Sequence, residues 1–138
     1  MKKLREMRNP LKYVQGRDAL LSFCKETEYM GKNYLFVCSH SAYEACHDKL
    51  EKSFEGTDKV RHYEIFGGIS SESEIARMRK IVQENSIDTV VGVGGGSAVD
   101  TAKATAFYEK KHIVIIPTVV ATDAPCTGLS VIYHDDGS

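Results

Sequence analysis

The sequence contains no tryptophan and only 3 prolines among its 138 residues, and neither sign of charge is in large excess. The formal net charge is -1, so the chain offers no extended basic surface to a nucleic acid backbone or to anionic lipid. No apolar run approaches the length of a membrane span, and the basic start MKKLREMRNP is not followed by the apolar segment of a signal peptide. We therefore expect a cytoplasmic protein that binds neither nucleic acid nor membrane.

Metal-ligand spacing is missing from the cysteines and the histidines. No two cysteines form a C-x-x-C pair, and all but Cys126 lie in segments with apolar periodicity. Buried, reduced thiols are therefore favoured over disulfides or a metal site. The histidines are scattered, and we expect them at the surface or at strand ends: His40, His47, His62, His112 and His134.

Short β-branched runs alternate with segments of helical periodicity along the chain. This alternation predicts βαβ units, and hence a single α/β domain with a Rossmann-like parallel sheet and flanking helices. At this length one domain buries roughly two-thirds of its unfolded surface. The predicted strands are Lys12 to Gln15, Tyr34 to Cys38, Val60 to Phe66, Thr89 to Val93, Ile113 to Ile116 and Ser130 to Tyr133.

Helix starts are predicted at Asp18, at Ser41 with Glu44, and at Ser71 with Glu74, the last two as capping boxes. Gly67 and Gly68 indicate a turn before the third of these helices. That helix presents an apolar stripe to the sheet, made of Ile75, Met78, Ile81 and Val82. The chain ends in a strand-like run and a turn signal with no returning strand, and we expect that it is truncated.

The most informative segment is TVVGVGGGSAVDTAKATAF, in which a buried-strand pattern runs into Gly94, Gly95 and Gly96 and then into a helix predicted to open at Ser97. Glycines allow a sharp turn and close approach of a ligand, and the helix start offers unpaired N–H groups and a positive dipole end. This pattern favours a phosphate-binding turn. Ser97 with Asp100 also has the spacing of a helix cap, and the alternative is a tight strand-to-helix connection without a ligand.

Two common phosphate motifs are excluded by the spacing of this segment. The sequence G-x-x-x-x-G-K-[ST] is absent, which argues against a nucleotide triphosphatase. Counted from Gly92, the third glycine of G-x-G-x-x-G would fall at Ser97, and the segment follows a late strand. The residues by themselves therefore predict a phosphate-bearing ligand without identifying it.

GVGGGSAVDTAKA and IIPTVVATDAPCTGLSVIYHDDG together resemble the glycerol dehydrogenase branch of the iron-containing alcohol dehydrogenase superfamily, as do LKYVQG, EKSFEG and FGG. The resemblance implies that residues 1–138 form the NAD(P)-binding N-terminal domain of a two-domain, dehydroquinate-synthase-like fold. A helical C-terminal domain supplies that family's ligands to a divalent metal, commonly zinc. That metal-binding domain is absent from this chain, so we expect no metal ligand here.

The resemblance also assigns site residues. The family's pyrophosphate-contacting turn falls on Gly95, Gly96, Ser97, Ala98, Val99 and Asp100, and its next nucleotide-contacting segment on Thr118, Val119, Val120 and Ala121. Its nicotinamide and ribose contacts fall on Thr127, Leu129 and Tyr133, and its substrate-contacting carboxylate falls on Asp123. From the residues alone, Asp123 would instead be taken as a turn former ahead of Pro125.

Two positions depart from the family pattern. Ser39 stands where the family usually carries an Asp that binds the adenosine ribose hydroxyls, and its neighbours are His40 and Ser41. Because a carboxylate there repels a 2′-phosphate, its absence relaxes the preference for NAD over NADP. Ala121 replaces a usual Ser, which removes one hydroxyl but no backbone contact.

The implied activity is the NAD(P)-dependent, metal-assisted oxidation of glycerol or a related polyol. The metal would lower the pKa of the bound alcohol, and hydride would pass to the nicotinamide. We expect this chain alone to be inactive, and the full-length enzyme to be a homo-oligomer. The alternatives are a stand-alone nucleotide-binding module, a truncated remnant without activity, and dehydroquinate-synthase-like chemistry, which fits TDAPC less well.

Overall fold

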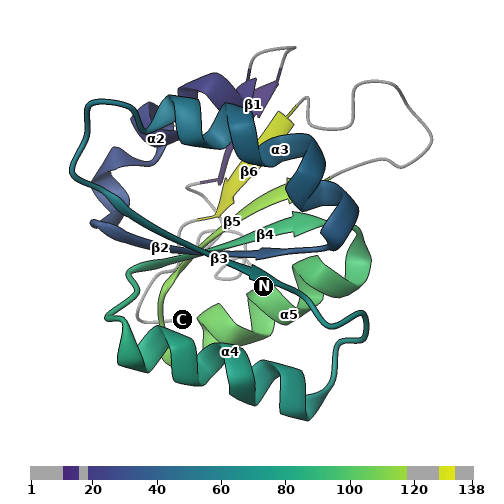
Figure 1. The fold of residues 1–138 in the computed structure, drawn as a ribbon. Coiled ribbons are helices and arrows are strands. Elements are labelled where there is room, and N and C mark those ends of the chain that lie inside the picture. The colour runs from purple at the N-terminus through teal and green to yellow at the C-terminus, as the bar shows by residue number, and fades with distance from the viewer. Residues whose placement is uncertain (1–10, 16–18, 118–127, 133–138) are drawn as a thin grey trace, which may run out of the picture.

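The computed structural model describes residues 11–15, 19–117 and 128–132. They form a six-stranded sheet of order β1-β6-β5-β4-β2-β3, enclosed between two layers of helices (Figure 1). The strands are β1 (Leu11–Gln15), β2 (Asn33–Cys38), β3 (Val60–Ile65), β4 (Thr89–Gly94), β5 (His112–Pro117) and β6 (Gly128–Ile132). The helices are η1 (Ala19–Ser22), α2 (Phe23–Glu26), η2 (Glu28–Met30), α3 (His40–Ser53), α4 (Glu72–Glu84) and α5 (Gly96–Glu109).

The predicted parallel sheet is confirmed for four adjacent strands, β3, β2, β4 and β5. The sheet is mixed beyond them, because β6 runs antiparallel to both β5 and β1. All six predicted strands are present, with ends that differ by one or two residues where they are described. Tyr133, the predicted end of the last strand, lies outside the described residues.

Each face of the sheet has its own apolar core. On the face covered by α3, Phe23, Tyr34, Phe36 and Phe54 form an aromatic cluster with ring centroids 5.2 to 6.2 Å apart. Tyr34 is fully buried, and its hydroxyl donates to Thr27 O at 2.9 Å. The hydroxyl is therefore satisfied, and burial raises the pKa of Tyr34 to about 12.

The opposite face carries α4 and α5. Met78 and Val82 of the predicted α4 stripe are buried, and Ile81 packs against the same cluster. On α5 the buried residues Ala98, Ala102 and Ala106 are small, which lets this helix approach the sheet closely. The two connections that leave β2 and β4 therefore cover opposite faces of the sheet (Figure 1).

Two of the predicted helix starts can be compared with the structure. Ser71 is the N-cap of α4 as predicted, and its hydroxyl accepts from Glu74 N. The start predicted at Ser41 is wrong, because Ser39 caps α3 and accepts from Ala42 N. Ser39 has the extended backbone of the strand that precedes it, which points its hydroxyl at the first turn. Asp18 lies outside the described residues, and helical structure follows it from Ala19.

The expectation of reduced cysteines is only partly correct. Cys24 and Cys38 are free and buried, and Cys46, although also buried, is disulfide-bonded. A disulfide depends on the distance between two cysteines in space, which sequence spacing does not give. Among the helices that the structure describes, none combines the length and the apolar composition needed to cross a bilayer.

Candidate functional site

The carboxyl edge of the parallel strands contains a topological switch point between β2 and β4. The chain leaves β2 through α3 and returns in β3, on one side, and it leaves β4 through α5 and returns in β5, on the other. The two helices cover opposite faces of the sheet, so the connections diverge between these strand ends. Ligands of open α/β sheets bind outside the carboxyl ends of the strands at such a switch point.

Hydrogen bonds hold the strand ends at this edge in a fixed row. Ser39 N, just after β2, donates to Val93 O of β4 at 3.1 Å. Phe66 N, just after β3, donates to Cys38 O of β2 at 2.7 Å. The ends of β4, β2 and β3 therefore lie side by side, and the three glycines that follow Val93 begin at one end of this row.

The glycines around the end of β4 have different reasons to be glycine. A Cβ at Gly92 would lie 2.8 Å from Ala102 Cβ and 3.1 Å from Val99 Cα, so Gly92 allows α5 to pack against the strand. Gly94 has a φ of +140°, which side chains rarely tolerate. At Gly95 and Gly96 a Cβ would meet no atom of the described residues within 4 Å. Packing among these residues therefore does not require glycine at either position.

Among the described helix starts at this edge, only that of α5 lacks a side-chain cap. Gly95 is its N-cap, makes no side-chain cap bond, and no acidic residue lies in the first turn. By contrast, the α3 and α4 starts are capped by Ser39 and Ser71. The first N–H groups of α5 therefore remain for solvent or for a ligand, together with the positive end of the helix dipole.

The prediction that Ser97 opens this helix is wrong by one residue, since α5 begins at Gly96. Gly95 has an extended backbone, and its carbonyl accepts from Val99 N at 3.1 Å, which starts the helical ladder at the glycine. Ser97 already lies inside the helix, where its carbonyl accepts from Thr101 Oγ1. The predicted cap formed by Ser97 and Asp100 is therefore replaced by an uncapped glycine.

The remaining predicted site residues are distributed as follows. Ser97 and Asp100 are exposed at the start of α5, Val99 is half-buried, and Ala98 is buried in the core. Leu129 lies near the start of β6, which is antiparallel to β5, so it lies at the same edge but beyond β5. Outside the described residues lie Thr118, Val119, Val120, Ala121, Asp123, Thr127 and Tyr133.

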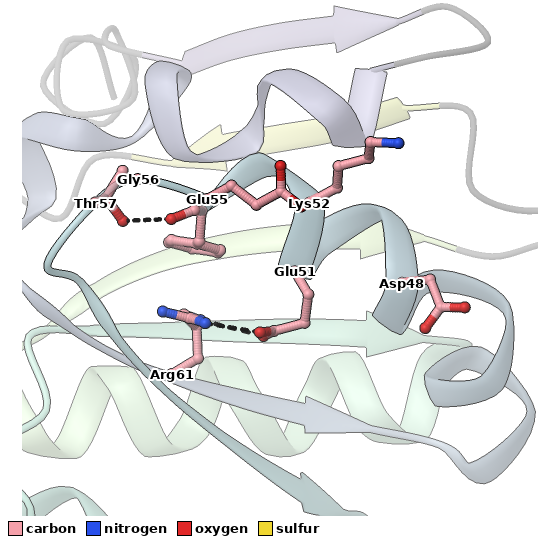
Figure 2. A pocket seen from close by; sticks show the side chains of 8 residues that line it. Asp48, Glu51, Lys52, Glu55, Gly56, Thr57 and Arg61 are labelled. Carbon is pink, nitrogen blue, oxygen red and sulfur yellow. Dashed lines mark hydrogen bonds and ion pairs between the residues drawn. The ribbon is translucent and has the colours of Figure 1, made fainter.

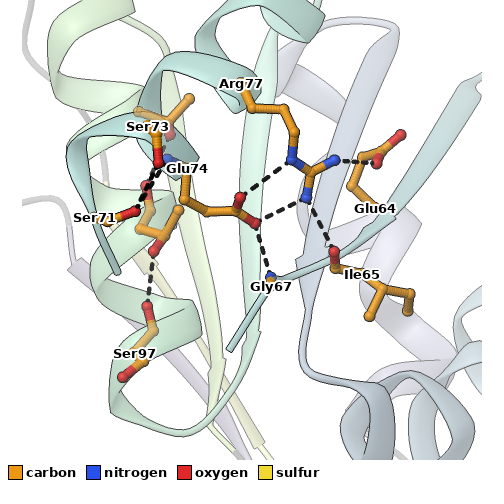
Figure 3. Close-up of polar contacts among 10 residues, drawn as sticks. Glu64, Ile65, Gly67, Ser71, Ser73, Glu74, Arg77 and Ser97 are labelled. Atoms are coloured by element: carbon orange, nitrogen blue, oxygen red, sulfur yellow. Dashed lines mark hydrogen bonds and ion pairs between the residues drawn. The ribbon is translucent and has the colours of Figure 1, made fainter. Parts of the chain in front are cut away.

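Sequence reasoning missed a polar network that holds the loop between β3 and α4 (Figure 3). Glu74 Oε2 accepts from Gly67 N at 2.8 Å and from Arg77 Nη2 at 2.8 Å. The Arg77 guanidinium holds the pKa of the Glu74 carboxyl below its ordinary value, and the Gly67 N–H acts in the same direction. The Ser71 and Glu74 spacing predicted only a helix cap, because no local signal marks the contact with Gly67.

A cavity of about 590 Å³ lies where α3 ends and β3 begins, away from Gly94, Gly95 and Gly96 (Figure 2). Its main charged groups satisfy one another, because Arg61 Nη2 donates to Glu51 Oε1 at 2.7 Å and Tyr63 Oη donates to Glu51 Oε2 at 2.8 Å. The bond from Arg61 also lowers the pKa of Glu51. We therefore place the candidate site at the switch point and treat this cavity as structural. The lining residues are Asp48, Glu51, Lys52, Phe54, Glu55, Gly56, Thr57 and Arg61.

The described side chains can also be considered as ligands of a metal. Within residues 11–15, 19–117 and 128–132, no three His, Cys, Asp or Glu side chains gather where they could hold an ion. The described part of the chain therefore does not by itself fit a metal centre, whereas the uncapped helix start and the open glycines fit a phosphate group.

Comparisons of the sequence with known proteins point to one family of enzymes. The sequence model of the iron-containing alcohol dehydrogenase family matches residues 10–138. Glycerol dehydrogenase of Thermotoga maritima is 42% identical over 132 residues, which cover 93% of this chain and 35% of that protein. Glycerol dehydrogenase of Pseudomonas putida is 34% identical over 133 residues, 96% of this chain and 36% of that one. The chain thus spans little more than a third of these relatives.

Two solved structures superpose on most of this chain. Glycerol dehydrogenase from Schizosaccharomyces pombe superposes with a TM-score of 0.71 at 27% identity, over 80% of this chain and 28% of that one. A probable glycerol dehydrogenase from Sinorhizobium meliloti gives a TM-score of 0.63 at 34% identity, over 78% of this chain and 28% of that one.

Proposed function

The chain belongs to the iron-containing alcohol dehydrogenase family, and from that premise we propose that it is the nucleotide-binding half of an NAD(P)-dependent oxidoreductase that acts on glycerol or a related polyol. The polyol is proposed because several of its relatives are named glycerol dehydrogenases. The nucleotide is proposed on one structural observation. Gly95 and Gly96 border open space beside an uncapped helix start at the switch point of the sheet.

The proposed role of the start of α5 is to bind the pyrophosphate of the cofactor. The backbone N–H groups of Gly96 and Ser97 have no partner within the helix and can donate to phosphate oxygens. Side chains at Gly95 and Gly96 would fill the space that those oxygens need. No carboxylate lies in the first helical turn to repel them. Ala98 and Val99 support the turn through packing, and Asp100 lies exposed beside it.

The two halves of the cofactor are placed on opposite sides of β4. Ser39, at the end of β2, is assigned to the adenosine ribose, and Leu129, on β6 beyond β5, is assigned to the nicotinamide side. A dinucleotide whose pyrophosphate lies at Gly95 has one nucleoside on each side, which suits this arrangement. The remaining assigned contacts are Thr118 to Ala121, Thr127 and Tyr133 for the cofactor and Asp123 for the substrate.

Ser39 is proposed to make the site tolerant of NADP as well as NAD. Its hydroxyl accepts from Ala42 N at 3.3 Å. Because a hydroxyl is neutral, Ser39 presents no negative charge to the ribose. A carboxylate at this position would hydrogen-bond a 2′-hydroxyl and repel a 2′-phosphate. We expect comparable affinity for NADH and NADPH.

When bound, the nicotinamide supplies the chemistry by accepting hydride from the alcohol carbon. The chain's own residues bind and orient the cofactor. We propose that the metal, zinc, is held by ligands outside this chain. The chain alone should therefore bind the cofactor without oxidising an alcohol.

The experiment is a titration of the 138-residue chain with NADH and then NADPH, followed by nicotinamide fluorescence. We expect saturable binding with a Kd between about 1 μM and 1 mM for both, and competition by ADP-ribose. The proposal fails if a folded sample, checked by circular dichroism, binds neither nucleotide at millimolar concentration.

A further inference from the structure

The C-terminal end of α5 presents two aromatic side chains to solvent. Phe107 is 60% exposed and Tyr108 is 55% exposed. Of the large hydrophobic residues that the structure describes as exposed, only these two are neighbours in the chain. Their ring centroids lie 5.6 Å apart at an interplanar angle of 70°, so the rings pack edge to face. The aromatic pair therefore forms a joint apolar surface, whereas exposed hydrophobic residues that stand alone are common.

The neighbouring helix holds Tyr108 in place. The guanidinium of Arg79, on α4, lies over the Tyr108 ring, 5.0 Å from its centroid. Arg79 Nε donates to Glu109 Oε2 at 2.7 Å, and Gln83 Nε2 donates to the same oxygen at 2.9 Å. These side chains come from two helices that lie side by side on one face of the sheet (Figure 1). Because the Tyr108 ring is already held, a partner that binds it has less conformational entropy to remove.

The border of the aromatic pair is positively charged. Lys103 lies four residues before Phe107, on the same side of the helix, and Lys110 and Lys111 directly follow α5. None of the three lysines forms an ion pair with a residue that the structure describes. Glu109, the acid beside the pair, is already bound to an arginine, and its side chain is only 11% exposed. The charge that remains for a partner is therefore that of the lysines.

This surface lies far from the proposed nucleotide site. The helix α5 begins at the carboxyl end of β4 and is 14 residues long, so its two ends lie about 20 Å apart. The exposed acid Asp100 belongs to the first part of the helix, two turns before Phe107. A partner at the end of α5 would therefore leave Gly95 and Gly96 open.

The chemistry of this surface selects its partner. Aromatic residues and arginine are enriched at the centres of protein interfaces, where they supply most of the binding energy. Lysines around such a centre attract carboxylates. An anionic membrane is less well matched, because each lysine adds only about 1 kcal/mol there and stable attachment needs a larger basic cluster. We propose that the end of α5 docks an acidic segment of another protein, which packs an apolar side chain against Phe107 and Tyr108 and places carboxylates beside Lys103, Lys110 and Lys111.

The test uses a library of random short peptides displayed on phage. The 138-residue chain is immobilised through a terminal tag, so that its lysines stay free, and the selection is made at low ionic strength. We expect the enriched peptides to combine Asp and Glu with a Phe, Trp or Leu. The best of them, labelled with a fluorophore, is titrated with the chain by fluorescence anisotropy. Added salt should weaken its binding, because salt screens exposed charges.

Three variants locate the binding surface. Phe107→Ser should weaken peptide binding about tenfold or more, because it removes an apolar contact. Lys103→Glu should weaken it about threefold or more, because it repels the carboxylates of the peptide. Lys49→Glu is the matched control, because Lys49 is an exposed lysine on α3, on the other face of the sheet, and it should retain wild-type affinity. All three should keep the wild-type melting temperature, since the changed side chains are exposed.

Two results would overturn the proposal. The first is a set of enriched peptides without acidic residues, or one that binds Phe107→Ser as tightly as wild type. The second is binding of the wild type, and not of Phe107→Ser, to phosphatidylserine vesicles, which would make a membrane the partner. Neither result depends on NADH, so a folded chain that fails to bind NADH would refute the proposed function and leave this test unchanged.

Discussion

The Ser39 hydroxyl lies beside Gly94, so close that a Cβ added to Gly94 would be 2.8 Å from Ser39 Oγ. The same hydroxyl caps α3, and the Ser39 backbone N–H bonds to Val93 O. Ser39 therefore joins the end of β2, the start of α3 and the end of β4. In this way the two strand ends that flank the switch point are fixed relative to each other before any ligand binds.

Gly94→Ala should lower the free energy of unfolding by about 2 to 4 kcal/mol, because it adds a steric clash with Ser39 to an unfavourable backbone conformation. Gly56→Ala is the matched control. Gly56 also has a positive φ, of +80°, but a Cβ there would meet nothing within 4 Å, so we expect a loss of about 1 kcal/mol. Urea denaturation measures both. Equal losses would show that the contact with Ser39 contributes nothing.

Ser39→Asp should convert a tolerant site into one selective for NAD. Aspartate is as good an N-cap as serine, so the melting temperature should change little. Its charge should weaken NADPH binding about tenfold or more relative to NADH, because it repels the 2′-phosphate. Ser39→Asn, which has nearly the same shape and no charge, is the control. An unchanged ratio of NADH to NADPH affinity in Ser39→Asp would place the ribose elsewhere.

The central strands and the helix between β3 and β4 were predictable because their signals are local. Continuous apolar runs such as Val90 to Val93 are typical of strands buried on both faces. In the sequence from Ser71 to Val82, a cap is followed by an apolar stripe with helical spacing, and both features are present in α4. Periodicity does not reveal partners, however, so the antiparallel position of β6 between β1 and β5 could not be foreseen.

The details of the site could not be predicted without knowing which residues are neighbours in space. Ser39 lies just before α3 and Ser41 lies in its first turn, and the extended backbone of Ser39 makes it the cap. Gly94, Gly95 and Gly96 resemble one another in sequence, whereas in the structure Gly94 turns the chain and Gly95 borders open space. Glu74 accepts from Gly67 seven residues away, a contact that depends on how the loop returns to the helix.

The free energy of unfolding should decrease at acid pH, in part because Glu51 becomes protonated. The hydrogen bond from Arg61 holds the folded-state pKa of Glu51 below its ordinary value of 4.5, with a further contribution from Tyr63. A carboxylate whose pKa is depressed by folding stabilises the protein above its unfolded-state pKa, and this stabilisation is lost as the pH falls through the folded-state pKa. Glu51→Gln should therefore be less stable than wild type at pH 7, and the difference should shrink below about pH 4.5.

Urea denaturation at a series of pH values measures this effect. Glu55→Gln, which changes an exposed acid a few residues further on, serves as the control and should follow the wild-type pH profile. A constant difference in unfolding free energy between Glu51→Gln and wild type from pH 3 to pH 7 would contradict a role for the ionised Glu51.

The alkylation rates of the Cys24 and Cys38 thiols should report how fast the native protein opens. Burial raises the pKa of both, that of Cys38 to about 12, and Cys38 is 1% exposed. Since the thiolate is the reactive form, native protein at pH 8 should react with iodoacetamide at these residues only as fast as it opens. Peptide mass spectrometry after timed alkylation measures the rates. NADH should slow them further, because a ligand that binds only the native state stabilises it. Rapid alkylation of Cys38 in the native chain would show that the end of β2 is not closed.

The most direct test of the nucleotide site is a comparison of NADH binding by the wild-type chain and by Gly95→Asp, each with its unfolding curve. Aspartate at an N-cap supports a helix, and a Cβ at Gly95 would meet no atom of the described residues within 4 Å, so the free energy of unfolding should be unchanged or higher by a few tenths of a kcal/mol. The same carboxylate would occupy the place assigned to the pyrophosphate, and NADH affinity should fall by about 100-fold or more. Wild-type affinity in a stable Gly95→Asp variant would contradict the placement of the cofactor at the start of α5.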